Sequence, residues 1–289
     1  MKLVMNPLRT PGIRPALRKF HRPVLVGATI SLSCLVCLTL SVRFSEAQEV
    51  LPSAFEGIWS TTVTAITHPD WTIDDLFACN CTRETYEYLD QLLHDPANNH
   101  LSAADIQQAI RERNLAGITG LFTETAKEYA LTYDHADDPS IQCEYFGAFR
   151  TVLHNDPILI EQYENHISIK GEDMTSDRII YTDGRSHPEN EAPSPLGHSI
   201  GWYEGSTLVV ETINVSANIA EDNLPIHNSD EARSVERYTR SEDGSRLHME
   251  FTLIDPVMFN EPLILERTRL LTPEVDLLDA PCESISGEF

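Results

Sequence analysis

The part of the chain that follows Cys143 alternates apolar and polar residues in short runs, and this pattern constrains the fold most. In its clearest run, apolar residues from Leu247 to Leu253 take every second position, with His248, Glu250 and Thr252 between them. A period of two is that of a strand with one buried and one solvated face. Such runs predict strands at 148–154, 157–163, 166–170, 177–182, 198–203, 207–214, 232–240, 246–254 and 262–271.

Residues suited to tight turns separate these runs, and they favour one continuous sheet. Asn165, Asp183-Gly184, Glu204-Gly205 and Asp243-Gly244 stand where left-handed backbone is needed. The β-branched stretch 55–67 predicts an additional first strand. So many consecutive strands favour closure, because a closed sheet has no exposed edges. We therefore expect a mainly β fold, an antiparallel meander that closes into a barrel.

The first predicted strand carries Gly57-x-Trp59, which is similar to the opening of lipocalin-like barrels. This resemblance implies a lipocalin-like barrel. Residues 72–131 have a different pattern and predict a helical insertion near its mouth. Thr82, Ser102 and Thr123 are suited to cap helices that run to about Leu93, Asn114 and Leu131, respectively.

The N-terminal segment is typical of export. Its first 23 residues hold six Lys or Arg and no acid, residues 24–42 are mainly apolar, and Ser45-Glu46-Ala47 follows. This order is that of a secretory signal, although the apolar run is also long enough to anchor the chain in a membrane. We expect residues 1–47 to be a signal peptide or signal anchor and 48–289 to be a single β-rich domain. The expected location is the periplasm or the outside of the cell, with inner-membrane anchoring if the leader is kept.

The charge of the predicted exported part excludes some partners. Residues 48–289 hold 14 basic and 44 acidic side chains, a net charge near −30. Such a surface repels nucleic acid and anionic membranes, so we expect no nucleic-acid partner and membrane contact only through an uncleaved anchor. Solubility explains the charge, and attraction of cations is the functional alternative. We expect a monomer.

Four cysteines remain in the predicted exported part, and an even number in an oxidising compartment suggests disulfides. A Cys143–Cys282 bridge would join the two ends of the strand-rich region. Cys79 and Cys81, separated by one residue, are too close for an easy ring. As a metal site this Cys-x-Cys pair would need two further ligands nearby.

Four segments carry a resemblance to a known group of proteins. They read IYTDGRSHP at 180–188, GHSIGWYEGSTLVVET at 197–212, HNSDEARSVERY at 227–238 and CEYFGAFR at 143–150. In their order along the chain and in their spacing they resemble a large group of secreted bacterial proteins of unassigned function, over residues 119–283. The resemblance implies no reaction, substrate or fold. The chain departs from the pattern at 144–146, where a proline is usual, and around Cys282.

Three histidines in these segments are candidates for chemistry. His187, His198 and His227 lie at strand starts or in loops beside polar residues, with Asp183 and Glu236 in the same segments. One interpretation is acid–base catalysis, with a histidine oriented by a carboxylate. A second is a divalent metal such as Zn²⁺. A third is structural, with imidazoles that pin loops through hydrogen bonds to backbone carbonyls.

Four other residues are candidates for contacts with a bound ligand: Tyr181, Arg185, Trp202 and Arg237. Arg185 has the alternative role of bracing its Asp-Gly turn. Because Glu236 and Arg237 are adjacent, one of them faces inward in a regular strand. A charged residue inside a barrel must be paired, either in a structural ion pair or with the polar head of a ligand.

These observations support three functions. The first is an exported barrel that binds a small, largely apolar molecule. The alternative is a barrel enzyme, an isomerase, lyase or hydrolase that uses the histidines and carboxylates, so whether the protein is an enzyme stays open. The third is a structural or envelope-interaction protein with a filled barrel. The sequence has no nucleophile elbow, phosphate loop, HExxH or dinucleotide fingerprint. No cofactor is predicted, with a divalent metal as the alternative.

Overall fold

The computed structural model describes residues 54–61, 79–134, 136, 138–144, 146–172, 177–221 and 226–278. The chain divides into two compact units, Met1–Glu49 and Val50–Phe289, and all described residues belong to the second. The predicted leader and Cys282 lie outside the described residues. Within the described ranges, no helix has the length and apolar character needed to cross a membrane.

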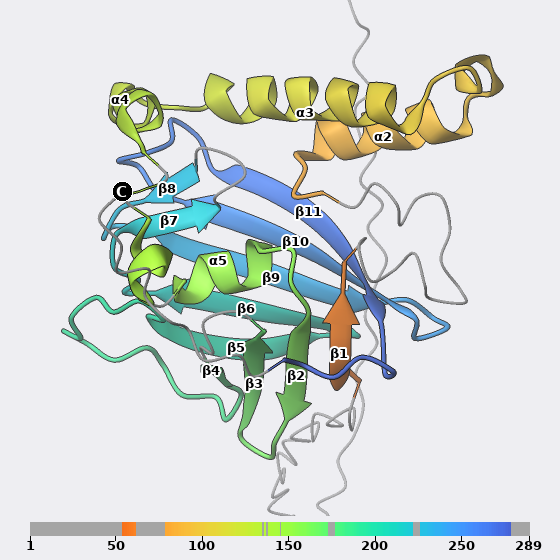
Figure 1. The fold of residues 1–289 in the computed structure, drawn as a ribbon. Helices are drawn as coiled ribbons and strands as arrows, with labels where there is room; N and C mark the ends of the chain where they lie inside the picture. Colours follow the sequence, from red (N-terminus) through yellow and green to blue (C-terminus); the bar gives the residue numbers. More distant parts are fainter. Residues whose placement is uncertain are drawn as a thin grey trace, which may run out of the picture. The chain divides into compact units, whose positions relative to one another are not determined.

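Nine strands close into a barrel in the order β1-β11-β10-β9-β6-β5-β4-β3-β2 (Figure 1). The prediction of a mainly β, lipocalin-like barrel is confirmed in general kind. The barrel strands are β1 (Gly57–Ser60), β2 (Ile158–Gln162), β3 (His166–Gly171), β4 (Asp177–Tyr181), β5 (His198–Glu204), β6 (Thr207–Ile213), β9 (Arg233–Arg240), β10 (Arg246–Ile254) and β11 (Leu263–Leu271).

Alternation along the strands directs one face into the barrel core. In β10, Leu247, Met249, Phe251 and Leu253 are all buried, as their spacing predicts. This strand pairs with β9 and β11 in unbroken antiparallel register, with Phe251 opposite Glu236 on one side and Leu265 on the other. Side chains at paired positions of neighbouring strands point to the same face of the sheet. Because the register is regular, the apolar side chains of these strands meet in one core.

The strand order departs from a simple antiparallel meander in two places. β4 and β5 pair in parallel, which requires a crossover, here residues 182–197. The crossover ends at Gly197, which has a φ of +58° and where a Cβ atom would lie 2.4 Å from the carbonyl oxygen of Ile213. The second departure is a hairpin outside the barrel sheet that the sequence pattern did not predict, formed by β7 (Asn218–Glu221) and β8 (Ile226–Asn228).

The strand predicted at 148–154 is wrong, because this segment forms helix α5 (Gly147–Leu153). All seven of its residues are buried, so no polar face marks it as helical in the sequence. Its apolar residues belong to the same core as the inward-facing strand residues. The rings of Phe149 and Phe251 meet edge to face, with centroids 5.6 Å apart.

Two buried arginines of β11 hold the C-terminal end of α5. Arg269 donates hydrogen bonds to the carbonyls of Val152 (3.1 Å), His154 (2.7 Å) and Asp156 (2.7 Å). Arg267 donates to the His154 carbonyl as well. These bonds satisfy carbonyls that a helix end leaves free, and positive charge is favourable there. Burial lowers the pKa of Arg267 to about 10, so it remains charged at neutral pH.

The predicted helical insertion is present as α2 (Arg83–His94), α3 (Ala103–Gly120) and α4 (Glu124–Thr132). Thr82, Ser102 and Thr123 cap these helices through their side chains, as predicted. Helix α3 runs six residues beyond Asn114, because that buried side chain hydrogen-bonds Asn80 and Thr82 outside the helix and does not end it. Short 3₁₀ turns, η2 (Pro96–Asn98) and η4 (Pro139–Gln142), complete the elements.

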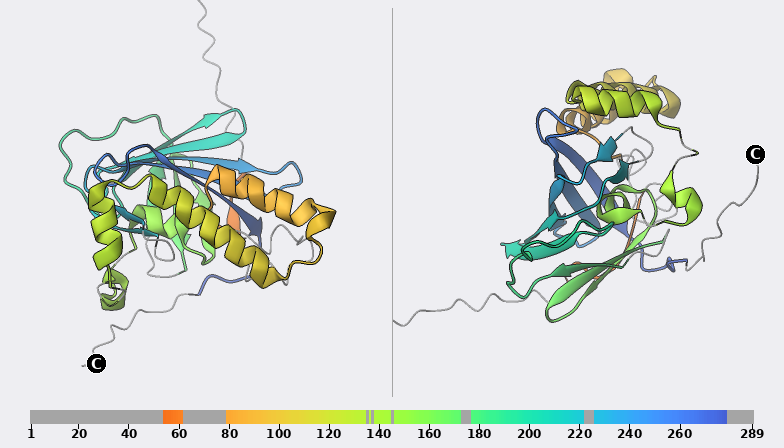
Figure 2. Two further views of the ribbon diagram at one scale, coloured as in Figure 1. Left: turned by 90° about the horizontal axis from the view of Figure 1, so that it is seen from above. Right: turned by 90° about the vertical axis from the view of Figure 1, so that its left-hand side faces the viewer.

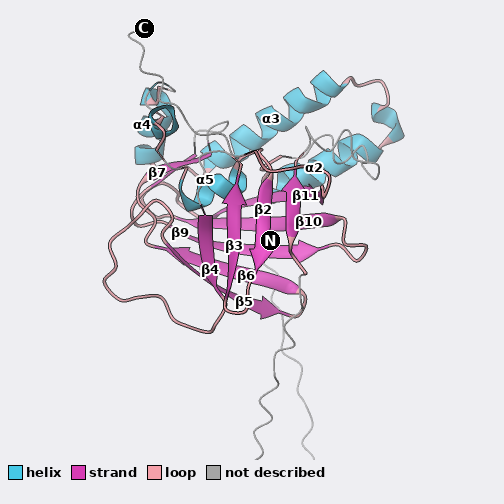
Figure 3. Ribbon diagram, turned by 60° about the horizontal axis from the view of Figure 1, so that its bottom comes forward, coloured by secondary structure: helices cyan, strands magenta, loops and turns pink. Residues whose placement is uncertain are grey.

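The helices gather at one end of the strands (Figure 3). Figure 2 shows α2 and α3 side by side across the barrel. Helix α2 contacts β11, where Arg83 pairs with Glu266 at 2.6 Å and Tyr86 hydrogen-bonds Thr268 at 2.9 Å. Polar contacts on the outer face of β11 therefore fix the helices relative to the barrel.

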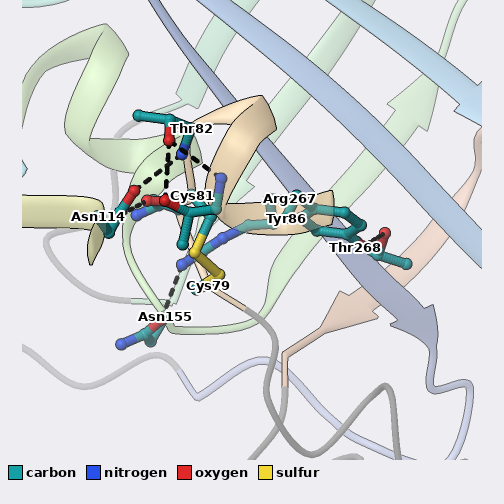
Figure 4. The surroundings of a disulfide bond; sticks show 10 residues. Cys79, Cys81, Thr82, Tyr86, Asn114, Asn155, Arg267 and Thr268 are labelled. Carbon is teal, nitrogen blue, oxygen red and sulfur yellow. Dashed lines mark hydrogen bonds between the residues drawn. A yellow bond between two sulfur atoms is a disulfide. The ribbon is translucent and has the colours of Figure 1, made fainter. Parts of the chain in front are cut away.

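Cys79 and Cys81 form a disulfide, which corrects the expectation that their spacing is too tight (Figure 4). The chain bends there so that the two Cα atoms lie 5.2 Å apart, within the usual range for disulfides. The disulfide leaves neither thiol free, so the alternative of a metal site at this pair does not apply. Cys143 is also disulfide-bonded. Its predicted partner, Cys282, lies outside the described residues, so that pairing stays a prediction.

The disulfide segment is joined to α3 through one buried side chain. Asn114 donates to the Asn80 carbonyl (2.8 Å) and accepts from the Thr82 backbone N–H (2.8 Å). We expect Asn114→Leu to lower the free energy of unfolding by roughly 1–3 kcal/mol, because two buried backbone groups lose their partners. Urea denaturation measures the loss. Gln107→Leu, an exposed change on the same helix, should stay within about 0.5 kcal/mol of the unchanged chain. Equal losses in both variants would contradict this role of Asn114.

Candidate ligand-binding cleft

A cleft of about 940 Å³ lies between α4, the segment that precedes α5, and the β7–β8 hairpin. Thr123 positions α4 there, because its hydroxyl donates to the Val257 carbonyl (2.7 Å) and its N–H to the Met258 carbonyl (3.0 Å). Val257 and Met258 also line the cleft, together with Ile219 of β7. The loop between β10 and β11 therefore holds the helix and forms part of the apolar lining.

Three aromatic rings meet in the cleft lining. His227 of β8 lies between Tyr129 of α4, at a centroid distance of 5.3 Å, and Tyr133, which caps the end of α4, at 5.1 Å. The exposed fraction of His227 is 9%. Among the described residues, neither ring nitrogen of His227 has a hydrogen-bond partner. Neither nitrogen is a fully buried atom, so both keep some exposure where His227 lines the cleft and are available to a ligand.

Polar residues of the hairpin complete the lining. Asn228 donates to the Ser216 carbonyl (2.9 Å), and the Asp230 carboxylate accepts from the Ala217 N–H (2.5 Å). Behind them, the buried carboxylate of Asp255 accepts from the N–H and hydroxyl of Ser229. These bonds fix the loop that follows β8, so the polar lining is preorganised.

The electrostatics of the cleft centre on His227 and Asp138. Burial lowers the pKa of His227, and the Asp138 carboxylate acts in the opposite direction with the smaller effect. For Asp138, burial raises the pKa, but hydrogen bonds from Arg150 and Ser140 outweigh burial and hold it below its usual value. Arg150 and Asp138 form a buried ion pair at 2.9 Å. His227 is consequently neutral at neutral pH, beside an ionised carboxylate.

The lowered pKa of His227 predicts a pH effect on stability. An imidazole that protonates less readily in the folded state than in the unfolded state costs stability as the pH falls below its unfolded value of about 6.5. Above that pH both states are neutral and the effect vanishes. We therefore expect the melting temperature to fall less between pH 7 and pH 5 in His227→Phe than in the unchanged chain. Parallel curves for the two proteins would show that His227 does not titrate in this way.

Two of the three predicted histidines meet elsewhere, at the crossover between β4 and β5. The Nδ1 atoms of His187 and His198 lie 2.8 Å apart, and His187 Nε2 lies 3.5 Å from a carboxylate oxygen of Glu211. Tyr181 stacks on His198 at 5.3 Å. Burial and the neighbouring His187 lower the pKa of His198. Neither histidine lines the cleft around His227, so the structure brings two members of the predicted set together and places the third apart.

Asp183 and Arg185 brace the turn that opens the crossover. Their side chains pair at 2.6 Å, and the contact with Arg185 lowers the pKa of Asp183 to about 2. The guanidinium carbon of Arg185 lies 3.7 Å from the centroid of the Tyr181 ring. Within the described ranges, no group of three or more histidine, cysteine or acidic side chains is arranged to hold a metal ion. Catalysis by the His187–His198 pair stays a prediction.

Glu236 is the inward member of the Glu236–Arg237 pair, and its charge is matched inside the barrel. Both Nη atoms of Arg178 donate to its carboxylate, at 2.8 and 2.9 Å. The hydroxyls of Ser234 (3.0 Å) and Tyr238 (2.6 Å) donate to it as well. All these groups are buried. Of the two alternatives for an inward charged residue, a structural ion pair or a contact with a ligand, the structure therefore shows the ion pair. Arg178 was not among the predicted residues, although its alternation with Ile180 marks it as inward.

Trp202 and Arg237 face the outside of the barrel. Arg237 pairs with Glu204 at 2.8 Å, and the Trp202 indole donates to the same carboxylate at 3.1 Å. Neither residue lines the cleft, and neither do Tyr181 and Arg185. Their predicted contact with a ligand stays a prediction.

The cleft brings in residues that the sequence interpretation missed. Tyr129 and Tyr133 are spaced four apart at the end of the third predicted helix, which places them on one face. His227, Asn228 and Asp230 come from the HNSDEARSVERY segment, so that segment is the signal that could have located the site. The resemblance to a group of secreted proteins stays a prediction. No protein-family model, curated protein or solved structure matches this chain.

Proposed function

We propose that this exported barrel protein binds a small, largely apolar molecule in the cleft between α4 and the β7–β8 hairpin. The observation that carries the proposal is His227, whose side chain is about nine-tenths buried in the lining while its partly accessible ring nitrogens have no hydrogen-bond partner among the described residues. The cleft volume of about 940 Å³ is in the range of small-molecule sites. Bound ligand would supply the missing partner and cover the aromatic surface.

The lining has the composition of a ligand site. Tyr129, Tyr133, Val257 and Met258 supply aromatic and apolar surface, and Asn228 supplies a polar group held in place by its backbone contact. Apolar surface contributes most of the affinity in such sites, and a few fixed polar groups set orientation. The cleft supports binding through the apolar body of a ligand and its orientation through one polar end.

Side chains fill the interior of the barrel, which supports a ligand site at the cleft and not inside the barrel. Inward positions carry large core side chains, including Phe149 of α5 and Phe251, and the buried Arg178–Glu236 pair. Export belongs to the proposal as well. The Cys79–Cys81 disulfide supports it, because disulfides persist in oxidising compartments.

A blocking substitution tests the site. Thr125 is exposed on α4 and lines the cleft, whereas Glu128 is exposed on the same helix and does not. We expect ligand-observed NMR to detect binding of at least one of benzyl alcohol, benzoate and benzyltrimethylammonium to the full exported domain. Thr125→Trp should weaken that binding about tenfold or more, because the indole occupies the cleft and removes a contact worth over 1.4 kcal/mol.

Glu128→Trp is the matched control and should bind as the unchanged domain does. Melting temperatures of both variants establish that each is folded. Binding that is equal in Thr125→Trp and Glu128→Trp would place the site elsewhere. Failure of all three probes to bind would contradict the proposed function itself.

A further inference from the structure

We propose that the molecule bound in this cleft is a small organic cation, an ammonium compound with an apolar or aromatic body. The inference rests on the proposed function and names the chemical class of its ligand. It is carried by three features of the cleft: the charges of its lining, the arrangement of its rings, and the unpartnered imidazole of His227.

The charged residues of the lining are all acidic. Glu144 and Asp230 line the cleft, both are exposed, and no lysine or arginine is among the described lining residues. The nearby Arg150 is buried and neutralised by Asp138 at 2.9 Å. An anionic ligand would meet two carboxylates without a compensating cation, whereas an ammonium group would meet opposite charge.

The aromatic lining suits the same chemistry. The faces of tyrosine rings attract a cation within about 6 Å through their quadrupole. Tyr129 is half-exposed, so part of its ring is accessible beside the buried His227. His227 carries no positive charge at neutral pH, because burial lowers its pKa. It therefore does not repel a cation, and its free ring nitrogen can accept a hydrogen bond from an N–H or O–H of the ligand.

The charge of the whole domain acts in the same direction. With 14 basic and 44 acidic side chains in residues 48–289, the domain attracts cations from a distance. This field is screened beyond about 8–10 Å at physiological salt, so it concentrates cations near the surface and does not select among them. The residues that line the cleft therefore determine which cation binds.

An isosteric pair of probes tests the charge alone. Choline and 3,3-dimethylbutan-1-ol have the same shape, but the quaternary nitrogen of choline is a carbon in the alcohol. We expect choline to bind the full exported domain about fivefold or more tightly than the alcohol, the combined effect of ring contacts and exposed carboxylates. Its binding should weaken as salt is raised from 20 to about 500 mM, because exposed charges are screened.

Substitutions that remove one charge each provide the second readout. Asp230→Asn keeps an oxygen that can accept from the Ala217 N–H. Among the described residues, Glu144 has no side-chain hydrogen bond that Glu144→Gln would break. Each variant should weaken choline about twofold to fivefold and leave the neutral alcohol unchanged. Glu231→Gln, an exposed neighbour outside the cleft, should change neither.

The outcomes separate the two proposals. Choline that binds no more tightly than its neutral isostere, or not at all, overturns the cationic class. If benzyl alcohol or benzoate still binds in a manner blocked by Thr125→Trp, the proposed function stands with a different ligand class. If neither Asp230→Asn nor Glu144→Gln weakens choline binding, the proposal that the carboxylates of this cleft attract the cation is also overturned.

Discussion

Replacing Glu236 with glutamine is expected to lower the free energy of unfolding by about 3–5 kcal/mol, the usual cost of breaking a buried ion pair on one side. The change leaves Arg178, with an exposed fraction of 1%, charged inside the barrel without its carboxylate. Although burial lowers the pKa of Arg178, Glu236 outweighs this and raises it, so the guanidinium stays charged in the native protein. Urea denaturation at neutral pH measures the loss.

The matched control is Glu204→Gln, which breaks the ion pair on the outer face. Glu204 and Arg237 are both substantially exposed, so this pair contributes about 0–1 kcal/mol. The double variant Arg178→Met, Glu236→Gln should recover much of the stability lost in Glu236→Gln, because the unpaired buried charge is removed. If Glu236→Gln and Glu204→Gln cost the same, the buried pair is not a fixed part of the barrel.

Phe149→Ala is expected to cost about 3–5 kcal/mol, the usual effect of truncating a buried phenylalanine. Phe149 has an exposed fraction of 1% and packs edge to face on Phe251 of β10. The substitution leaves a cavity between α5 and the strands, and the rigid barrel closes it only in part. Denaturation measured by circular dichroism tests the value.

Leu131→Ala is the control for apolar truncation, because Leu131 is 87% exposed on α4. Its effect should stay within about 0.5 kcal/mol. A loss below about 1 kcal/mol for Phe149→Ala would mean that α5 is not part of the barrel core. In that case a filled barrel core would no longer support placing the ligand at the cleft and not inside the barrel.

Sequence patterns predicted the barrel strands because each has one buried face and one wet face. The Leu247–Leu253 alternation is the clearest example, and the helix caps at Thr82, Ser102 and Thr123 were equally readable. Helix α5 and the β7–β8 hairpin were not, because their residues are buried almost throughout and show no period. A segment buried on all sides does not reveal whether it is helix or strand.

The candidate site was predicted in part for a similar reason. His187 lies in the crossover and His198 directly follows it, so their contact follows from local chain geometry. His227 was grouped with them by residue type, but its place is set by a hairpin and by Tyr129 of α4, about one hundred residues earlier in the chain. Contacts between such distant segments depend on the packing of the whole fold.

The ring nitrogens of His227 give the most direct test that the cleft binds a small molecule. In a long-range ¹H–¹⁵N spectrum of the histidine-labelled domain (residues 48–289) at pH 7, the His227 signals are those missing from His227→Phe. Adding benzyltrimethylammonium should shift these signals and leave those of the exposed His100 in place. Binding of this probe with the His227 signals unmoved, or failure of this probe, benzyl alcohol and benzoate all to bind the domain, would contradict the account.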